Sequence, residues 1–132
     1  VSHDRTKIRA VSVANSNDIL RKLDPKAQVI GIDEVHFFDK GIARVCERLA
    51  NQGKRVIAAG LDLDYRGVPF SQTSELLSKA EYVTKNLAIC VICGEPASRT
   101  FKKSGGKQRI EVGHFNKYEA RCRTCFSLGN KV

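Results

Sequence analysis

Four of the five cysteines form two CxxC pairs, Cys90 with Cys93 and Cys122 with Cys125. Two thiolates at this spacing can bind one face of a tetrahedral Zn²⁺ ion, and a second pair completes the shell without leaving a position for water or substrate. The spacing therefore predicts a structural zinc site rather than a catalytic one. Because zinc binding to small cysteine-rich units contributes roughly 10–16 kcal/mol at neutral pH, we expect chelation to unfold this segment.

The same cysteines could instead form two disulfides or a thioredoxin-like redox couple. A single CxxC pair is enough for redox exchange, whereas two pairs at this separation favour metal. The fifth cysteine, Cys46, falls at helical spacing with Ile42, Val45 and Leu49. This pattern predicts a buried thiol that packs as a small hydrophobic side chain.

A second candidate site is the acidic pair Asp33-Glu34, which directly follows the apolar run at 27–32. Two carboxylates at the end of a buried strand are typical of a Walker B element, in which one acid holds Mg²⁺ and its neighbour orients a nucleophile. Two acids after a strand also occur as a simple solvated turn. The pair alone therefore leaves both interpretations open.

The elements around this pair predict a βαβ unit. Residues 27–32 and 55–60 are short, β-branched and apolar, which predicts two strands buried on both faces of a parallel sheet. Residues 41–50 form an amphipathic pattern typical of a helix between them. The carboxyl ends of parallel strands carry functional residues, so Asp33, Glu34 and the loop from Leu61 are expected to lie together.

The remaining elements are expected to be short. Residues 61–70 contain too much Gly, Pro and Asp for regular structure but keep apolar side chains, which is typical of a binding loop. We expect helices capped by Asn17 and by Ser74, the latter continuing through Ala80. Further strands are expected at 7–13, 83–89 and 109–112, and residues 102–109 are expected to be either mobile or a hairpin tip.

The chain has 132 residues, 42% of them hydrophobic, and a net charge of +9. The excess of Lys and Arg is greater in 90–132, which includes both cysteine pairs. Such charge suits nucleic acid or the phosphates of a nucleotide, or simply a solvated surface. The aromatic residues of this region show no regular alternation with the charges, so nucleic acid is the less favoured partner. No run approaches the ~20 apolar residues of a membrane span, so no membrane association is expected.

Several motifs in order resemble the zinc-containing thymidine kinase family. They are Asp33-Glu34-Val35-His36-Phe37-Phe38, Leu61-Asp62 with Arg66-Gly67 and Pro69-Phe70, and the two cysteine pairs with Tyr118 ahead of the second. The resemblance extends over nearly all of the chain. It implies a P-loop (RecA-like) parallel α/β core in residues 1–89 and a zinc-ribbon-like lobe in residues 90–132, which carries a lasso loop over the substrate.

The resemblance also implies a role for each matching residue. Glu34 would be the general base facing the thymidine 5′-hydroxyl, and Asp33 and Asp4 would lie on the side of Mg²⁺ and the ATP phosphates. The residues implied to enclose or cover thymine are Phe37, Leu61, Tyr65, Phe70, Thr100, Val112, Gly113 and Tyr118. Several of these have a simpler interpretation: Phe37, Leu61 and Phe70 could be core residues, and Tyr118 could pack on the zinc site.

Two features depart from the family pattern. His36 stands where the family commonly has glutamine, and we interpret it as a tolerated local change. The G-x-x-x-x-G-K-[ST] loop that binds ATP phosphates does not occur in the sequence. Because the family carries this loop upstream of the Ser-His-Asp motif at which the sequence begins, we expect a preceding segment in the natural protein.

The activity that the resemblance implies is transfer of the γ-phosphoryl group of ATP to the 5′-hydroxyl of thymidine, which yields dTMP for nucleotide salvage. It also implies structural zinc, Mg²⁺ with ATP, feedback inhibition by dTTP, a homotetramer and a cytoplasmic location. The alternative is a non-catalytic zinc module that binds nucleic acid and is attached to a degenerate NTPase core. Binding of thymidine or of single-stranded DNA would distinguish the two.

Overall fold

The computed structural model describes residues 10–103 and 117–129. Its first part is a βαβ unit in which β1 (Val29–Ile32) and β2 (Arg55–Ala58) are parallel and α2 (Ile42–Asn51) connects them. The register pairs Ile30 with Val56 and Ile32 with Ala58. This arrangement confirms the predicted strand, helix and strand.

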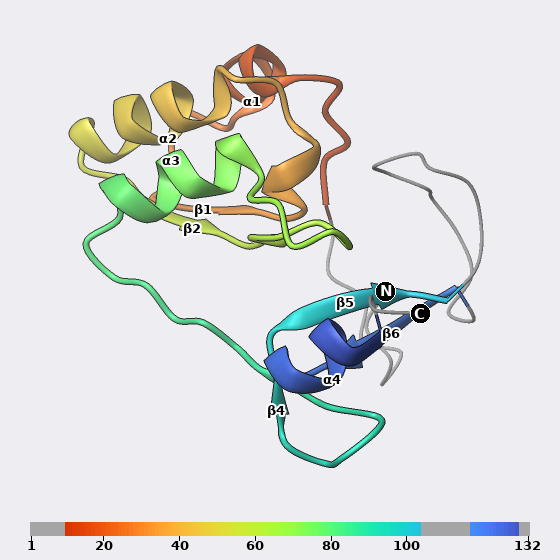
Figure 1. Cartoon of the computed structure of the whole chain (residues 1–132). Coiled ribbons are helices and arrows are strands. Elements are labelled where there is room, and N and C mark those ends of the chain that lie inside the picture. Colours follow the sequence, from red (N-terminus) through yellow and green to blue (C-terminus); the bar gives the residue numbers. More distant parts are fainter. Residues whose placement is uncertain (1–9, 104–116, 130–132) are drawn as a thin grey trace.

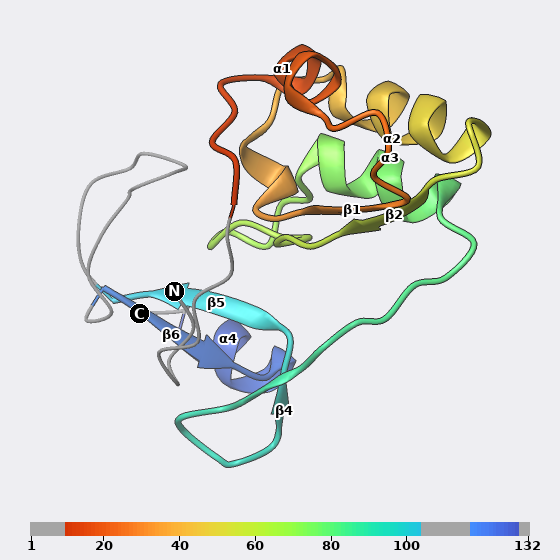
Figure 2. The same ribbon diagram turned by 180° about the vertical axis from the view of Figure 1, so that it is seen from behind.

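The prediction that both strands are buried on two faces is wrong. Ile30 and Ile32 are each 7% exposed, but Val29 on the other face is 60% exposed and Ile57 is 55% exposed. The reason is that α1 (Ser16–Lys22), α2 and α3 (Ser71–Lys79) all lie on one side of the two strands, as Figures 1 and 2 show. Within the described residues the parallel sheet has two strands, so the wider sheet of a P-loop core is not seen.

A single hydrophobic core fills the space between these helices and the inner face of the sheet. Ile42 is fully buried, Leu49 is 1% exposed, and Cys46 lies between them on the same face of α2. Burial raises the pKa of the Cys46 thiol to about 11, so this thiol is a packing group rather than a nucleophile. The prediction for Cys46 is confirmed.

The starts of two helices differ from the prediction. Asn15, not Asn17, caps α1, because its side chain accepts a hydrogen bond from the Asp18 amide at 3.1 Å. Helix α3 begins at Ser71, so Ser74 lies inside the helix, and no side chain caps its start. Both helices begin earlier than their apolar patterns indicated.

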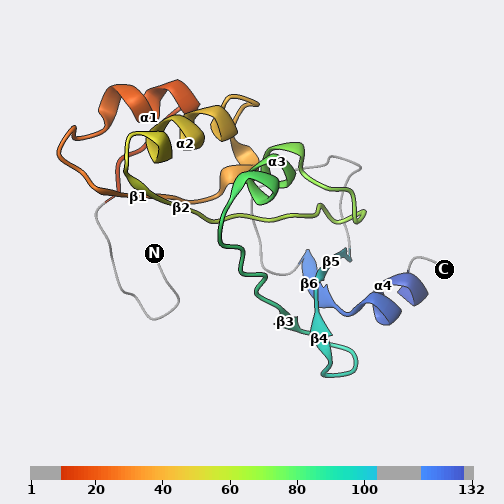
Figure 3. The same cartoon turned by 90° about the vertical axis from the view of Figure 1, so that its left-hand side faces the viewer.

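An extended segment after α3 leads to the second part of the chain, as Figure 3 shows. This part contains a short antiparallel pair, β3 (Ala88–Ile89) with β4 (Pro96–Ala97), and a longer one, β5 (Arg99–Lys102) with β6 (Tyr118–Arg121). Helix α4 (Arg123–Gly129) follows. We call residues 88–103 and 117–129 the cysteine lobe.

Other predicted strands are shorter than expected or lie outside the described residues. The strand predicted at 83–89 is reduced to its last two residues, and residues 10–13 of the strand predicted at 7–13 are not in a strand. The hairpin tip beyond residue 103 and the return strand at 109–112 lie outside the described residues. No helix in the described part of the chain is long and apolar enough to cross a membrane.

Candidate active site and metal centre

The acidic pair lies at the carboxyl end of β1, where the chain turns into the 3₁₀ helix η1 (Val35–Phe37). Glu34 has φ 53° and ψ 42°, and it is the one non-glycine residue with positive φ among residues 10–103 and 117–129. Its amide donates to Asp33 Oδ1 at 2.9 Å. A non-glycine residue held in this left-handed region costs about 1–3 kcal/mol, and such strain is concentrated at functional sites.

The loop that follows β2 lies beside this acidic pair. The Val35 amide donates to the Ala59 carbonyl at 3.0 Å, which ties η1 to the end of β2. Phe37 is 53% exposed and Leu61 is 50% exposed, so neither is a core residue. Phe70 is buried at 5% exposure and packs on the ring of His36. The structure therefore brings Asp33, Glu34, Phe37, Leu61 and Phe70 to one end of the sheet.

Asp64 gives the loop a fixed shape, a role that was not predicted from the sequence. This residue is buried at 5% exposure, and its Oδ1 accepts hydrogen bonds from the amides of Arg66 and Val68, each at 2.9 Å. The Gly67 amide donates to the Asp64 carbonyl at 2.9 Å, and Gly67 has φ 77°. An aspartate three residues before a glycine is a common β-turn pattern, so the signal was present in the sequence.

The cysteine lobe contacts this loop through its longer strand pair. Lys102 of β5 lies 4.7 Å from the centre of the Tyr65 ring and 6.0 Å from that of Tyr118. Thr100 lies in the same strand and pairs with Ala120 of β6. Thr100, Tyr65 and Tyr118, all predicted to enclose the substrate, are therefore close to the contact between the two parts of the chain.

The four paired cysteines converge as the spacing predicts. The sulfur atoms of Cys90, Cys93, Cys122 and Cys125 all lie within 4.8 Å of one another. Cys93 Sγ is 3.6 Å from both Cys122 Sγ and Cys125 Sγ. Zn–S bonds of about 2.3 Å in a tetrahedron separate the sulfurs by about 3.8 Å, so the cluster fits this ion.

The electrostatics of the cluster also favour a cation. Burial opposes ionisation of Cys90, but amides of the two turns, led by that of Cys122, lower its thiol pKa to about 6. Cys125 has the opposite shift, because the neighbouring thiols of Cys122 and Cys93 raise its pKa to about 12. Four thiolates this close repel one another, so full ionisation requires a positive ion among them. These four cysteines could hold a zinc ion.

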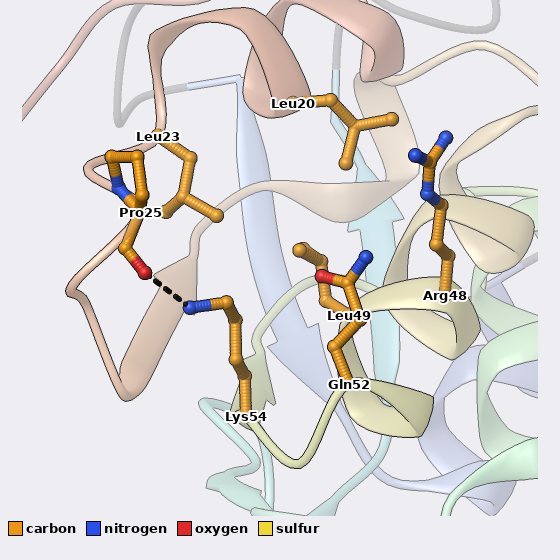
Figure 4. A pocket seen from close by; sticks show the side chains of 7 residues that line it. All are labelled: Leu20, Leu23, Pro25, Arg48, Leu49, Gln52 and Lys54. Atoms are coloured by element: carbon orange, nitrogen blue, oxygen red, sulfur yellow. Dashed lines mark hydrogen bonds between the residues drawn. The ribbon is translucent and has the colours of Figure 1, made fainter.

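Three sequence-predicted site residues lie outside the described residues, namely Asp4, Val112 and Gly113. A surface hollow of about 260 Å³ lies elsewhere, and Figure 4 shows its lining. Lys54 at the start of β2 borders it and donates to the Pro25 carbonyl at 3.0 Å. Because parallel strands start at the edge opposite to their carboxyl ends, this hollow is remote from Glu34. None of the sequence-predicted site residues that the structure describes lines it.

Fold and site together define a mixed α/β protein that combines an acidic pair at a strand end with a lobe whose four clustered cysteines could hold a metal ion. A family model described as thymidine kinase matches residues 1–126. The chain therefore belongs to the thymidine kinase family, and its cysteine cluster is consistent with the zinc-containing type.

Proposed function

We propose that the protein is a thymidine kinase that transfers the γ-phosphoryl group of ATP to the 5′-hydroxyl of thymidine. The observation that carries this proposal is the position of Glu34, which lies at the end of β1 in a strained conformation, within the region that matches the family. Backbone strain of this kind is concentrated at functional sites, so it favours a functional role for the Glu34 side chain. A carboxylate suits the task of accepting the proton of an alcohol nucleophile.

The proposed chemical step uses Glu34 as general base. An alcohol is too weak an acid to be ionised beforehand, so Glu34 aligns the 5′-hydroxyl and accepts its proton as the new O–P bond forms. The bond between the γ-phosphorus and the bridging oxygen breaks, and its electron pair leaves with ADP. Glu34 has a side chain that is 59% exposed, so a nucleoside can reach it from solvent.

Asp33 and Asp4 are the proposed residues on the side of the metal and the phosphates. Carboxylate oxygens are the ligands that Mg²⁺ prefers in proteins, and Asp33 is exposed at the strand end, which fits this use. When bound, Mg²⁺ would neutralise negative charge on the phosphoryl group that ATP transfers. The chain's own contribution is to hold carboxylates next to the base.

The proposed thymine pocket combines the loop after β2 with the cysteine lobe. Phe37 and Leu61 present half-exposed apolar surface beside Glu34, which suits the faces of a base. Tyr65 and Tyr118 come from the two parts of the chain, and both rings lie near the amino group of Lys102. The residues proposed to complete the pocket are Phe70, Thr100, Val112 and Gly113. Zinc at the four cysteines would hold the lobe that carries Thr100 and Tyr118.

The regulatory and cellular properties of the family are also proposed for this chain. They are inhibition by dTTP at the substrate site, assembly as a homotetramer and a cytoplasmic location. Salvage of thymidine to dTMP would be the reaction's place in metabolism.

The alternative function, a nucleic-acid-binding zinc module, has weaker support. Several cations of the cysteine lobe contact aromatic rings: Arg99 lies over Phe126, and Arg121 lies 3.4 Å from the centre of the Phe101 ring. Arg121 also pairs with Glu119 at 2.6 Å. Cations engaged in this way contribute less to a phosphate-binding surface than their number suggests.

Two measurements test the proposal. Isothermal titration with thymidine should show binding that Tyr118→Ala weakens, whereas salt-sensitive binding of single-stranded DNA without nucleoside binding would support the alternative. A phosphorylation assay with thymidine and ATP should detect dTMP, and Glu34→Gln should lower kcat by about 10²–10⁴-fold. Full activity of Glu34→Gln would contradict the assignment of the base.

A further inference from the structure

His36 is the middle residue of η1, and its buried imidazole lies at the centre of the candidate site. It is 3% exposed, although it lies between the exposed side chains of Glu34 and Phe37. A polar group that is buried in a protein normally has specific hydrogen-bond partners. The partners of His36 connect it to both strand ends of the βαβ unit.

The first partner fixes the tautomer of the ring. The Leu61 amide donates to His36 Nδ1 at 3.1 Å. Because a backbone N–H is always a donor, Nδ1 must accept and carries no proton. The proton of the neutral ring is therefore on Nε2.

The second partner is the proposed general base. His36 Nε2 lies 3.4 Å from Glu34 Oε2, on the opposite side of the ring from the Leu61 amide. This distance is longer than a well-formed hydrogen bond, but hydrogen bonds of catalytic groups commonly shorten when the substrate is bound. The Nε2–H group therefore lies within reach of the carboxylate of Glu34.

Packing holds the ring in this position. The centre of the His36 ring is 4.2 Å from that of Phe37 and 5.0 Å from that of Phe70. A Cβ atom on Gly60 would lie 3.1 Å from His36 Nδ1 and 2.8 Å from Val35 Cγ2, so glycine allows this close approach. The imidazole is therefore restrained by the hydrogen bond at Nδ1 and by contacts with two aromatic rings.

We propose that His36 is a positioning residue, whose neutral imidazole orients the Glu34 carboxylate through Nε2–H and fixes the loop after β2 through Nδ1. This inference rests on the proposed function of Glu34 as the base. It revises our interpretation of His36 as a tolerated change. Glutamine can make the same two interactions, because its side-chain oxygen accepts from Leu61 and its amide group donates to Glu34.

The tautomer can be measured on the unmodified protein, with no ligand added. Long-range ¹H–¹⁵N spectra should give His36 the pattern of a ring protonated on Nε2 at neutral pH. A ring protonated on Nδ1 would overturn the proposal, whatever the activity of the protein. This measurement does not depend on any variant folding.

Variants then test positioning. His36→Leu keeps an apolar side chain in the core but loses the polar contacts with Leu61 and Glu34, whereas the side chain in His36→Gln can make both. With the full-length enzyme, His36→Leu should lower kcat by about 10²-fold with a smaller change in the KM for thymidine, because misplacement by about 1 Å costs this much. His36→Gln should restore kcat to within about threefold of the parent protein, since it retains the orienting groups. Equal loss in both variants, or unchanged kcat in His36→Leu, would overturn the proposal.

A measurement that does not require catalysis tests the positioning role of His36 independently of the proposed function. Side-chain ¹³C relaxation of Glu34 should show restricted motion in the parent protein and His36→Gln, and increased motion in His36→Leu. Should the parent protein prove inactive with thymidine, the proposed function fails, and this relaxation still decides the positioning role. Equal mobility of Glu34 in all three proteins would refute that role.

Discussion

At the scale of single residues, the conformation that presents Glu34 for its proposed role conflicts with the stability of the fold. Its left-handed conformation is unfavourable for any residue with a Cβ atom, and glycine adopts it without that cost. No strain of this kind is needed simply to end a strand. The local backbone is therefore arranged to project a carboxylate beside Phe37 and Leu61 at a cost to the fold.

This conflict predicts that Glu34→Gly makes the protein more stable while it abolishes phosphoryl transfer. Relief of the left-handed strain exceeds the added entropy of glycine in the unfolded chain, so the free energy of unfolding should rise by about 0.5–1 kcal/mol. Urea denaturation of both proteins measures this difference.

A matched control has the same chemical change at an ordinary position. Glu75 is exposed within α3, where glycine disfavours the helix, so Glu75→Gly should lower the free energy of unfolding by about 1 kcal/mol. Opposite signs at residues 34 and 75 support strain at Glu34. A loss of stability in Glu34→Gly would show that the conformation is not strained.

His36 predicts a dependence of stability on pH. Burial lowers the pKa of its imidazole, and the negative charges of Glu34 and Asp33 only partly oppose this effect. Below about pH 6.5 the unfolded chain therefore binds a proton more readily than the folded protein does, so the free energy of unfolding falls as the pH is lowered. Urea denaturation between pH 5 and 8 should show this decline.

His36→Gln provides the comparison, because glutamine does not titrate. The decline below pH 6.5 should be weaker in this variant, and the two other histidines of the sequence, His3 and His114, are present in both proteins. Parallel pH profiles of the two proteins would mean that His36 has an ordinary pKa in the folded state.

At the scale of elements, Asp39 joins the starts of α1 and α2. Its carboxylate accepts hydrogen bonds from the amide and the hydroxyl of Ser16, each at 2.8 Å, and from the Gly41 amide at 2.8 Å. The Ser16 amide, followed by its hydroxyl, lowers the pKa of Asp39. Ser16 is 1% exposed, so these bonds also satisfy polar groups of a buried residue.

Asp39→Asn should therefore destabilise the protein. One carboxylate oxygen is replaced by an amide donor that faces the N–H group of Ser16 or Gly41. The free energy of unfolding should fall by only about 1 kcal/mol, because Asp39 is exposed to solvent. A lowered pKa contributes stability above the pKa of the unfolded aspartate, so the difference between the variants should shrink as the pH falls below about 4.

Asp24→Asn is the matched control for this variant. Asp24 is exposed, and its carboxylate accepts a local hydrogen bond at 2.9 Å from the amide of Lys26, two residues further along the chain. Its replacement should change the free energy of unfolding by no more than about 0.5 kcal/mol. Equal effects at residues 24 and 39 would show that Asp39 does not link the two helices.

The βαβ elements could be predicted because periodicity reports local structure directly. The apolar run before Asp33 and the pattern of Ile42, Val45 and Leu49 correspond to β1 and α2 as expected. Burial could not be predicted in the same way. A continuous apolar run is consistent with a strand covered on both faces, but what covers each face is decided by other elements, and the described helices cover only one.

The candidate site was predictable where chemistry depends on residue type and spacing. The two CxxC pairs and the acidic pair follow from the sequence, and the four cysteines do come together. The roles of His36 and Asp64 depend on which backbone amides face them, at Leu61 in one case and at Arg66 and Val68 in the other. Residue types alone do not give the direction of an amide.

At the scale of the whole molecule, the two parts of the chain are stabilised differently. The βαβ unit has a cluster of buried apolar side chains, whereas the cysteine lobe leaves Ile89 at 73% exposure and Ile92 at 60%. Its few buried residues include Ala97 and Phe126. A segment with so little apolar burial needs another source of stability, which a metal ion at the cysteines would supply.

Metal removal should therefore unfold the cysteine lobe and leave the βαβ unit folded. After chelation, hydrogen exchange of amides in 90–103 and 117–129 should increase at least about tenfold, because the lobe loses a contribution of several kcal/mol. Exchange in β1 and α2 should change by less than about twofold, since their core does not depend on the cysteines. Deuterium uptake measured by mass spectrometry resolves the two parts.

The same loss should weaken thymidine binding, because Lys102 and Tyr118 of the lobe would no longer lie beside Tyr65. Isothermal titration before and after chelation measures the change, and added Zn²⁺ should restore binding whereas added Mg²⁺ should not, since Mg²⁺ disfavours thiolate ligands. Elemental analysis must show that the metal has been removed. If the lobe then keeps its slow exchange and its affinity for thymidine, the ion does not hold the substrate-covering part of the molecule, and the four cysteines pack without it.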